Sequence, residues 1–241
     1  MAGGKSDLGV RTMSAVVMLA VAATALWLGG FAWLAFVGLV AFGAFYEWQK
    51  LAQQISPTIL GRVLWSLGGI VYFGMAAATL LFLRSAPDLG MLGVLLVVLP
   101  VIATDVGAYF AGRAIGGPKI AASISPSKTW AGLLGGMLAA GIVLALAVRY
   151  IGGSSVTVSY LPVYLFAGAV IAVIAQVGDF FESWMKRRAG VKDSGSLIPG
   201  HGGLFDRTDG LIAVLFALGL AVLLLAGTTL AGGSSLLPSP K

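Results

Sequence analysis

The chain has 241 residues, of which 59% are hydrophobic and only 10% are charged. Soluble domains carry about 25% charged residues, so this composition excludes a soluble globular protein and indicates an integral membrane protein. Cysteine is absent and histidine occurs once, which excludes disulfides, thiolate chemistry and metal sites built from several histidines. The formal net charge of +6 is first of all a topology signal, because basic residues collect in the cytoplasmic loops of membrane proteins.

Apolar stretches long enough to cross a bilayer follow one another along the chain. A spanning helix needs about 20 residues at a rise of about 1.5 Å per residue. Charged residues and glycine or proline turns divide the sequence into seven such stretches; the pair Gly29-Gly30, for example, separates the first two. We therefore predict an all-α membrane protein with about seven transmembrane helices. Their predicted ranges are 12–28, 31–50, 63–83, 89–112, 129–149, 162–186 and 210–231.

The first helix and the orientation follow from the basic residues. Lys5 and Arg11 precede an apolar run, as they would in a signal peptide. No clear small-x-small cleavage site follows, so we favour an uncleaved first helix. With the N-terminus in the cytoplasm, only Arg84, Arg149 and Lys241 of the 15 basic residues lie outside. The positive-inside rule thus predicts a cytoplasmic N-terminus and an external C-terminus.

Acidic residues gather at one predicted depth. Asp105, the pair Asp179 and Glu182, and the pair Asp206 and Asp209 all fall near the cytoplasmic boundary when residues are counted along their helices. Each pair is three residues apart and shares a helix face. Acids at membrane depth are costly and usually functional, and oxygen-only clusters suit Mg²⁺ bound together with substrate phosphates. The alternatives are salt bridges to nearby basic residues and a helix-cap role for the last acid.

The loop predicted between the sixth and seventh helices combines basic, glycine and acidic residues. A basic run from Lys186 to Lys192 is followed by the turn Gly202-Gly203 and two acids. Basic side chains and backbone N–H groups bind phosphate oxygens, so this loop suits a polyphosphate. Contacts to anionic lipid head groups are the alternative for the basic run. For His201 a structural hydrogen bond is favoured over a catalytic triad.

The loop between the fourth and fifth helices also has features of an anion site. Ser125-Pro126 precedes the fifth helix, and Lys128 and Thr129 stand in its first turn. Backbone N–H groups at a helix N-terminus favour anions, whereas a lysine there opposes the helix dipole unless it meets an anion. One more topology-setting lysine is the alternative interpretation.

The stretch from Ser183 to Asp209 resembles the signature of the phosphatidate cytidylyltransferases, also called CDP-diacylglycerol synthases. It reads Ser-x-hydrophobic-Lys-Arg, four residues, Lys-Asp, then His-Gly-Gly-hydrophobic-x-Asp-Arg-x-Asp, and it matches throughout. Shorter motifs are similar to the family's as well. They are Glu47-Trp48, Asp105-x-x-x-Tyr109 and Ser125-Pro-Ser-Lys-Thr-Trp-x-Gly132. The likeness covers the C-terminal half firmly and the N-terminal half only in hydropathy.

The resemblance implies an enzyme that joins CTP and phosphatidic acid into CDP-diacylglycerol and pyrophosphate by in-line attack at the α-phosphate of CTP. It implies Mg²⁺ as the cofactor, with K⁺ assisting. The implied metal ligands are Asp179 and Asp206, with Glu182 and Asp209 as further candidates. The expected catalytic residues are Asp179, Asp206, Lys186 and Arg207. The expected substrate-binding residues are Asp105, Tyr109, Ser125, Lys128, Thr129, Arg187, Lys192, Asp193, His201, Gly202 and Gly203.

We expect one polytopic membrane domain over residues 1–241, in which 1–104 supply the first helices, 105–209 the catalytic region and 210–231 the last helix. CTP would arrive from the cytoplasm and phosphatidic acid from the inner leaflet. This favours the bacterial cytoplasmic membrane, with the active site facing the cytoplasm, and the family suggests a homodimer. No nucleic-acid-binding module is present.

The sequence disfavours two rival functions. A cation carrier is disfavoured because carriers place charge near the bilayer midplane, whereas the acids here map to the inner boundary. A CDP-alcohol phosphotransferase or a prenyltransferase is disfavoured because their Asp-rich signatures, Asp-Gly-x-x-Ala-Arg and Asn-Asp-x-x-Asp, are not present.

Overall fold

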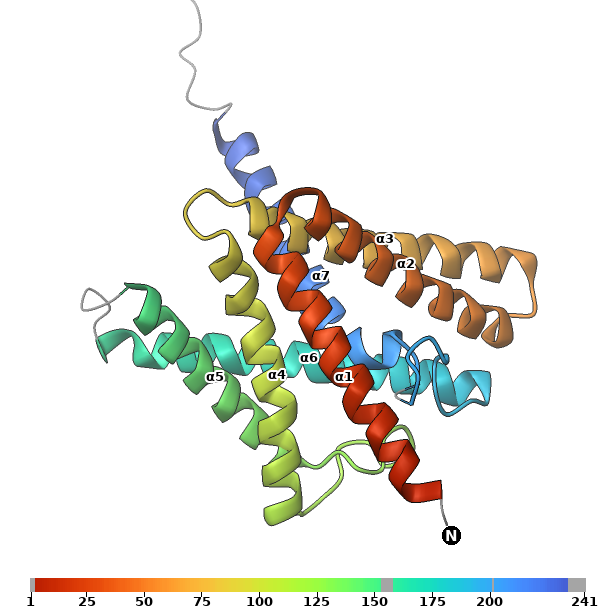
Figure 1. Cartoon of the computed structure of the whole chain (residues 1–241). Helices are drawn as coiled ribbons and strands as arrows, with labels where there is room; N and C mark the ends of the chain where they lie inside the picture. The colour runs from red at the N-terminus through yellow and green to blue at the C-terminus, as the bar shows by residue number, and fades with distance from the viewer. Residues whose placement is uncertain (1–2, 153–157, 201, 234–241) are drawn as a thin grey trace, which may run out of the picture.

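The computed structural model describes residues 3–152, 158–200 and 202–233, and most of them lie in long helices (Figure 1). Within these ranges, seven helices are long and apolar enough to cross a membrane, which confirms the predicted fold class. The elements are α1 (Gly3–Leu28), α2 (Gly30–Ile55), α3 (Ile59–Ser85), α4 (Met91–Ala114), α5 (Trp130–Gly152), a 3₁₀ turn η2 (Val158–Tyr160), α6 (Leu161–Ala189) and α7 (Phe205–Gly233).

Most helices extend beyond the predicted spans, whereas α4 and α5 begin one or two residues later than predicted. α2 continues to Ile55 instead of ending at residue 50, and α7 begins at Phe205 instead of residue 210. The prediction used charged residues as helix ends, but lysine, arginine and glutamate are good helix formers and prolong a helix past the hydrocarbon. Asp206 therefore lies inside the first turn of α7, where a carboxylate is favoured by the helix dipole.

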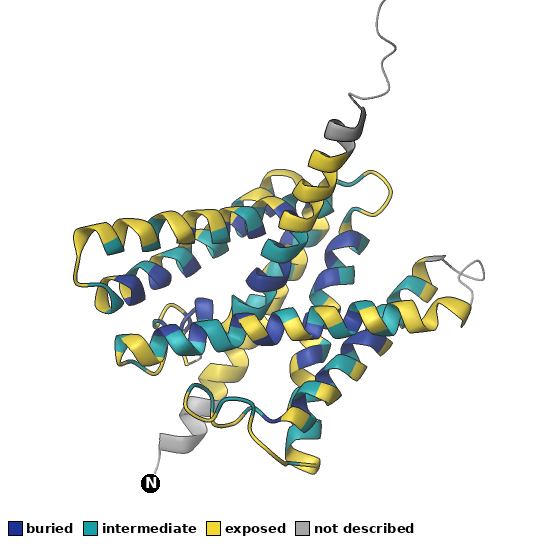
Figure 2. Cartoon of the chain, turned by 180° about the vertical axis from the view of Figure 1, so that it is seen from behind, coloured by how far each residue is buried: buried dark blue, intermediate teal, exposed yellow. Residues whose placement is uncertain are grey.

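The first and last described helices place the two described ends of the chain on opposite sides of the fold, as an odd number of membrane spans requires. In both views the start of α1 and the last described turns of α7 are at opposite ends of the molecule (Figures 1 and 2). Between α1 and α2, Gly29 adopts a positive φ of 67°, which confirms the predicted turn. Which end faces the cytoplasm stays a prediction.

Small residues allow α4, α5 and α6 to approach one another closely. A Cβ atom on Gly135 would lie 2.2 Å from the Cβ of Ala111 on α4. A Cβ on Gly168 of α6 would lie 2.3 Å from the Cα of Gly141 on α5. Membrane helices associate through such small-residue contacts, because backbones in contact gain van der Waals packing without a hydrophobic driving force. α4 and α6 are thereby held on either side of α5.

An aromatic cluster joins α2, α3, α6 and α7 at the end nearest the α6–α7 loop. Trp48 of α2 is 3% exposed and its indole N–H donates to the backbone oxygen of Trp65 at 2.9 Å. Its ring packs on Phe73, Phe181 and Phe205 at centroid distances of 5.6–6.0 Å. Figure 2 shows the buried residues concentrated where these helices meet, while α1 is mostly exposed. The cluster packs against Phe205, the first residue of α7, and so supports the adjoining α6–α7 loop.

Candidate active site

Four acidic side chains on α6 and α7 form a ladder with two rungs. In the inner rung Glu182 interacts with Asp206, and in the outer rung Asp179 interacts with Asp209. This register shows that the two helices run antiparallel. Because each helix contributes residues three apart, the rungs are separated by about 4.5 Å along the helix axis. The structure thus brings together all four acids that the spacing placed on two helix faces.

A backbone contact between the two helices explains why the acids meet. A Cβ atom on Gly178 would lie 2.7 Å from the backbone oxygen of Asp209 and 2.5 Å from the Cβ of Ala213. On the opposite helix, a Cβ on Gly210 would lie 3.3 Å from the backbone oxygen of Ala175. Glycine at these positions lets α6 and α7 touch, and the short acidic side chains beside them then reach each other.

The inner rung surrounds one ammonium group. The Nζ atom of Lys186 lies 2.6 Å from Oε2 of Glu182 and 2.6 Å from Oδ1 of Asp206. Glu182 is 1% exposed, and a cation beside so deeply buried a carboxylate offsets part of the cost of removing it from water. Its second oxygen, Oε1, has no hydrogen-bond partner among the described residues. Lys186 therefore pairs with both carboxylates of the inner rung and offsets one of their two charges.

Asp206 also holds the loop that connects α6 to α7. Its Oδ2 atom accepts hydrogen bonds from the backbone N–H and the hydroxyl of Ser194 and from the backbone N–H of Gly203, each at 2.9 Å. A Cβ atom on Gly203 would lie 2.1 Å from the Ser194 hydroxyl oxygen, so only glycine fits there. Gly203, predicted to bind substrate, here binds the catalytic-site carboxylate.

Glu47 on α2 is a site residue that sequence reasoning did not select. It is 1% exposed, and its Oε2 atom accepts from the backbone N–H of Phe205 at 2.8 Å and from the hydroxyl of Ser194 at 3.1 Å. The carboxylate thus sits at the N-terminus of α7, where the helix dipole stabilises it. The signal was present in the Glu47-Trp48 motif, but the residue looked like the charged end of a span.

The outer rung is completed by residues from α4 and from the α4–α5 loop. Lys128 forms an ion pair with Asp179. Asp105 of α4 interacts electrostatically with both of these residues, and Asp209 lies next to Asp179. Three carboxylates from three helices therefore surround one ammonium group. If all are ionised, the outer rung has an excess of negative charge.

The α4–α5 loop is arranged differently from the prediction at one point. α5 begins at Trp130, so Thr129 is its N-cap and its hydroxyl accepts from the backbone N–H of Gly132 at 3.1 Å. The backbone oxygen of Lys128 accepts from the N–H of Ile120 at 3.1 Å. Thr129 thus serves the helix, while the loop backbone positions the lysine.

Several predicted substrate-binding residues lie around the ladder rather than in it. Tyr109 is exposed and hydrogen-bonds with Arg113. Arg187 donates to the backbone oxygen of Ile124 at 3.4 Å, which connects the end of α6 to the α4–α5 loop. His201 lies outside the described residues. Ser125 and Gly202 are partly buried. Asp105, Tyr109, Arg187, Lys192 and Asp193 are the exposed members of the set, and Arg207, which was predicted to be catalytic, is exposed as well.

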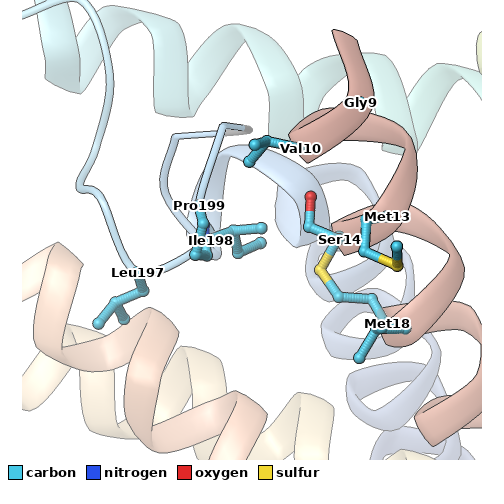
Figure 3. Close-up of a pocket in the computed structure, with 9 residues that line it drawn as sticks. Gly9, Val10, Met13, Ser14, Met18, Leu197, Ile198 and Pro199 are labelled. Carbon is cyan, nitrogen blue, oxygen red and sulfur yellow. The ribbon is translucent and has the colours of Figure 1, made fainter. Parts of the chain in front are cut away.

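Two cavities flank the site, and both are apolar. One, of about 570 Å³, lies between α1 and residues Leu197, Ile198 and Pro199 of the α6–α7 loop (Figure 3). The other, of about 910 Å³, lies between α3, α6 and α7. Neither lining contains a charged side chain. A triphosphate would be poorly solvated in either cavity, which leaves the ladder and its loops as the polar site.

Comparisons with known proteins point to one family. The family described as "Cytidylyltransferase family" matches residues 55–225. A protein of Brucella suis biovar 1 named phosphatidate cytidylyltransferase is 34% identical, with 86% of this chain and 90% of the relative covered. A protein of Rickettsia bellii with the same name is 35% identical, with 86% and 87% covered. One from Haemophilus influenzae is 34% identical over 70% of this chain and 59% of its own length.

Proposed function

The chain belongs to the cytidylyltransferase family, and we propose from this premise that it is a phosphatidate cytidylyltransferase. It transfers the cytidylyl group of CTP to phosphatidic acid, which gives CDP-diacylglycerol and pyrophosphate. A phosphate oxygen of phosphatidic acid attacks the α-phosphorus of CTP, and the bond from that phosphorus to the pyrophosphate oxygen breaks opposite to it. The observation that carries the proposal is the match over residues 55–225, which includes both rungs of the ladder.

Magnesium fits the acidic ladder. The donors are all oxygens, and the outer rung holds more carboxylates than the ammonium of Lys128 can neutralise. No three described acidic or histidine side chains form a complete metal group on their own, but Mg²⁺ is commonly held by one or two carboxylates and substrate phosphates. We propose Asp179 and Asp206 as ligands, with Glu182 and Asp209 as further candidates. The metal would neutralise charge on the triphosphate and the leaving pyrophosphate. A role for K⁺ stays a prediction.

Two partly buried lysines are placed to bind phosphate oxygens. Lys128 and Lys186 each pair with carboxylates of one rung. We propose that both turn from carboxylate to phosphate oxygens when the substrates bind, which keeps each ammonium group paired throughout. Lys186 and Arg187 at the end of α6, Lys192 of the α6–α7 loop and Arg207 at the start of α7 would receive the triphosphate. Lys128, on the other loop, would receive the lipid phosphate.

The chain is an integral membrane protein, given its seven apolar helices and its membership of the family. We propose that it lies in a bacterial cytoplasmic membrane with the ladder at the cytoplasmic side, because this orientation leaves only three of the 15 basic residues outside. There CTP arrives from the cytoplasm and phosphatidic acid from the leaflet, and neither has to cross the bilayer. A homodimer stays a prediction.

Radiolabelled CTP tests the proposal. The purified protein is mixed with phosphatidic acid in detergent micelles, with Mg²⁺, and the lipid product and pyrophosphate are measured. We expect equimolar CDP-diacylglycerol and pyrophosphate, formed only when phosphatidic acid is present, with turnover lost in EDTA and restored by excess Mg²⁺. Absence of a labelled lipid in the complete mixture would exclude the transferase. Equal turnover in EDTA would exclude the metal and retain the reaction.

A further inference from the structure

Glu47 is the buried acid for which the proposed reaction has no use. It lies on α2 and is not one of the four acids of the ladder, and no ion pair between its carboxylate and a lysine or arginine occurs among the described residues. Burying a carboxylate without a cation costs several kcal/mol. Its compensation is the N-terminus of α7, through the N–H of Phe205. A carboxyl group held at this buried position, whose partners in the described part of the chain come only from the α6–α7 loop and the start of α7, calls for a role in the site.

The α6–α7 loop is folded around this carboxylate. A Cβ atom on Gly195 would lie 2.1 Å from its Oε1 atom, and a Cβ on Gly203 would lie 2.6 Å from its Oε2 atom. Two glycines of the loop thus approach the two oxygens with no room for a side chain. Together with the bonds to Phe205 and Ser194, this contact ties the loop to α2.

Ser194 links Glu47 to Asp206. Its hydroxyl oxygen lies 3.1 Å from Oε2 of Glu47 and 2.9 Å from Oδ2 of Asp206. A hydroxyl has one proton to donate, so it can turn from one carboxylate to the other. Asp206 already accepts four hydrogen bonds, and a carboxylate has about four acceptor positions. The Ser194 hydroxyl is a donor that can leave Asp206 and still be satisfied.

We infer that Glu47 is a positioning residue of the active site, which fixes the α6–α7 loop through Phe205 and offers the Ser194 hydroxyl an alternative acceptor when Asp206 takes another ligand. The inference rests on the proposed function for the chemistry at Asp206. The anchoring of the loop, by contrast, is a property of the protein without substrates. Both parts can therefore be measured separately.

Limited proteolysis and kinetics test this role in Glu47→Ala, Glu47→Gln and Ser194→Ala. Trypsin cleavage after Lys192, an exposed residue of the loop, is timed in micelles. One hydrogen bond to a charged group corresponds to a factor of about ten or more. We expect Glu47→Ala to be cleaved about tenfold faster and to lose kcat by about tenfold or more, with the KM for CTP nearly unchanged. Glu47→Gln should recover both, because its amide oxygen can accept from Phe205.

Gln49→Met is the matched control. Gln49 lies one half-turn further along α2 and accepts a hydrogen bond from Ser66 of α3 at 3.0 Å, without touching the loop. The control should keep the wild-type cleavage rate and kcat. A Glu47→Ala protein with wild-type cleavage and kcat, or a Glu47→Gln protein no better than Glu47→Ala, would overturn the inference.

A double variant and the independence of cleavage from turnover distinguish the remaining outcomes. If Glu47→Ala does not accumulate as folded protein, Glu47→Asp, whose side chain is one methylene shorter, takes its place. In combination with Ser194→Ala, a kcat loss no larger than the larger single loss supports action through Ser194, and losses that multiply contradict it. Cleavage does not depend on turnover. A wild-type protein that transfers no cytidylyl group would refute the proposed function, while the cleavage rates would still decide whether Glu47 anchors the loop.

Discussion

Asp206→Asn should stop cytidylyl transfer and leave the protein folded. The asparagine oxygen can replace Oδ2 and accept from Ser194 and Gly203, but the amide nitrogen then faces the ammonium of Lys186 in place of a carboxylate oxygen now 2.6 Å away. The main loss is one hydrogen bond between charged groups, which costs about 1.5–3 kcal/mol. Lys186 keeps Glu182 at 2.6 Å, so no ammonium group is left alone.

The effect on the rate should be larger than the effect on stability. Removing one preorganised electrostatic group from an active site typically lowers kcat by about 10²–10³, and a thousandfold loss is about 4 kcal/mol. The stability cost of about 2 kcal/mol is a fraction of the usual 5–15 kcal/mol. We therefore expect a folded protein whose CDP-diacylglycerol formation is reduced about a thousandfold, below the detection of a standard assay.

Lipid product formation and thermal unfolding in micelles are measured together. Asp88→Asn is the control, because Asp88 is an exposed acid in the α3–α4 connection, far from the ladder in sequence; it should change neither quantity. If Asp206→Asn turned over CTP at a rate within a few-fold of the wild type, Asp206 would have no part in binding the metal or the phosphates. The catalytic role proposed for the acidic ladder would then be wrong.

The other expectations concern packing and charge. Gly203→Ala should inactivate the enzyme, because its Cβ would lie 2.1 Å from the Ser194 hydroxyl oxygen, whereas Gly38→Ala, with nothing within 4 Å of the added atom, should keep activity in the same assay. Lys186→Met should lower the free energy of unfolding by about 3–5 kcal/mol, because Glu182 would stay buried without its cation. Adding Glu182→Gln should recover much of that loss, and a double variant as unstable as the single one would contradict the assigned pair.

The number of spanning helices and the meeting of the acids could be predicted from the sequence. Backbone groups in a bilayer must be satisfied within the helix, so apolar length alone reveals the spans. Residues three apart share a helix face whatever the tertiary structure, which is why Asp179 with Glu182, and Asp206 with Asp209, were placed correctly on two faces. Helix ends were less accurate, because charged residues continue a helix as well as ending it.

The anchoring role of Glu47 could not be predicted in the same way. Its hydrogen-bond partners Ser194 and Phe205 are 147 and 158 residues away, so no local spacing connects them. The use of Thr129 as a helix cap was also hidden, because a hydroxyl beside a lysine suits a cap and an anion site equally. Such assignments depend on which acceptor is nearest in space, and only coordinates supply that.

The close contact of α6 and α7 at Gly178 and Gly210 has a consequence for biogenesis. Both rungs come from α6 and α7, which are consecutive helices. The acids can therefore meet as soon as α7 enters the bilayer, with little loop-closure entropy to overcome. Glu47, inserted much earlier, is satisfied only when these two helices dock against α2. The acidic ladder thus forms only after α7 has been inserted, because a chain that stops before α7 lacks Asp206 and Asp209.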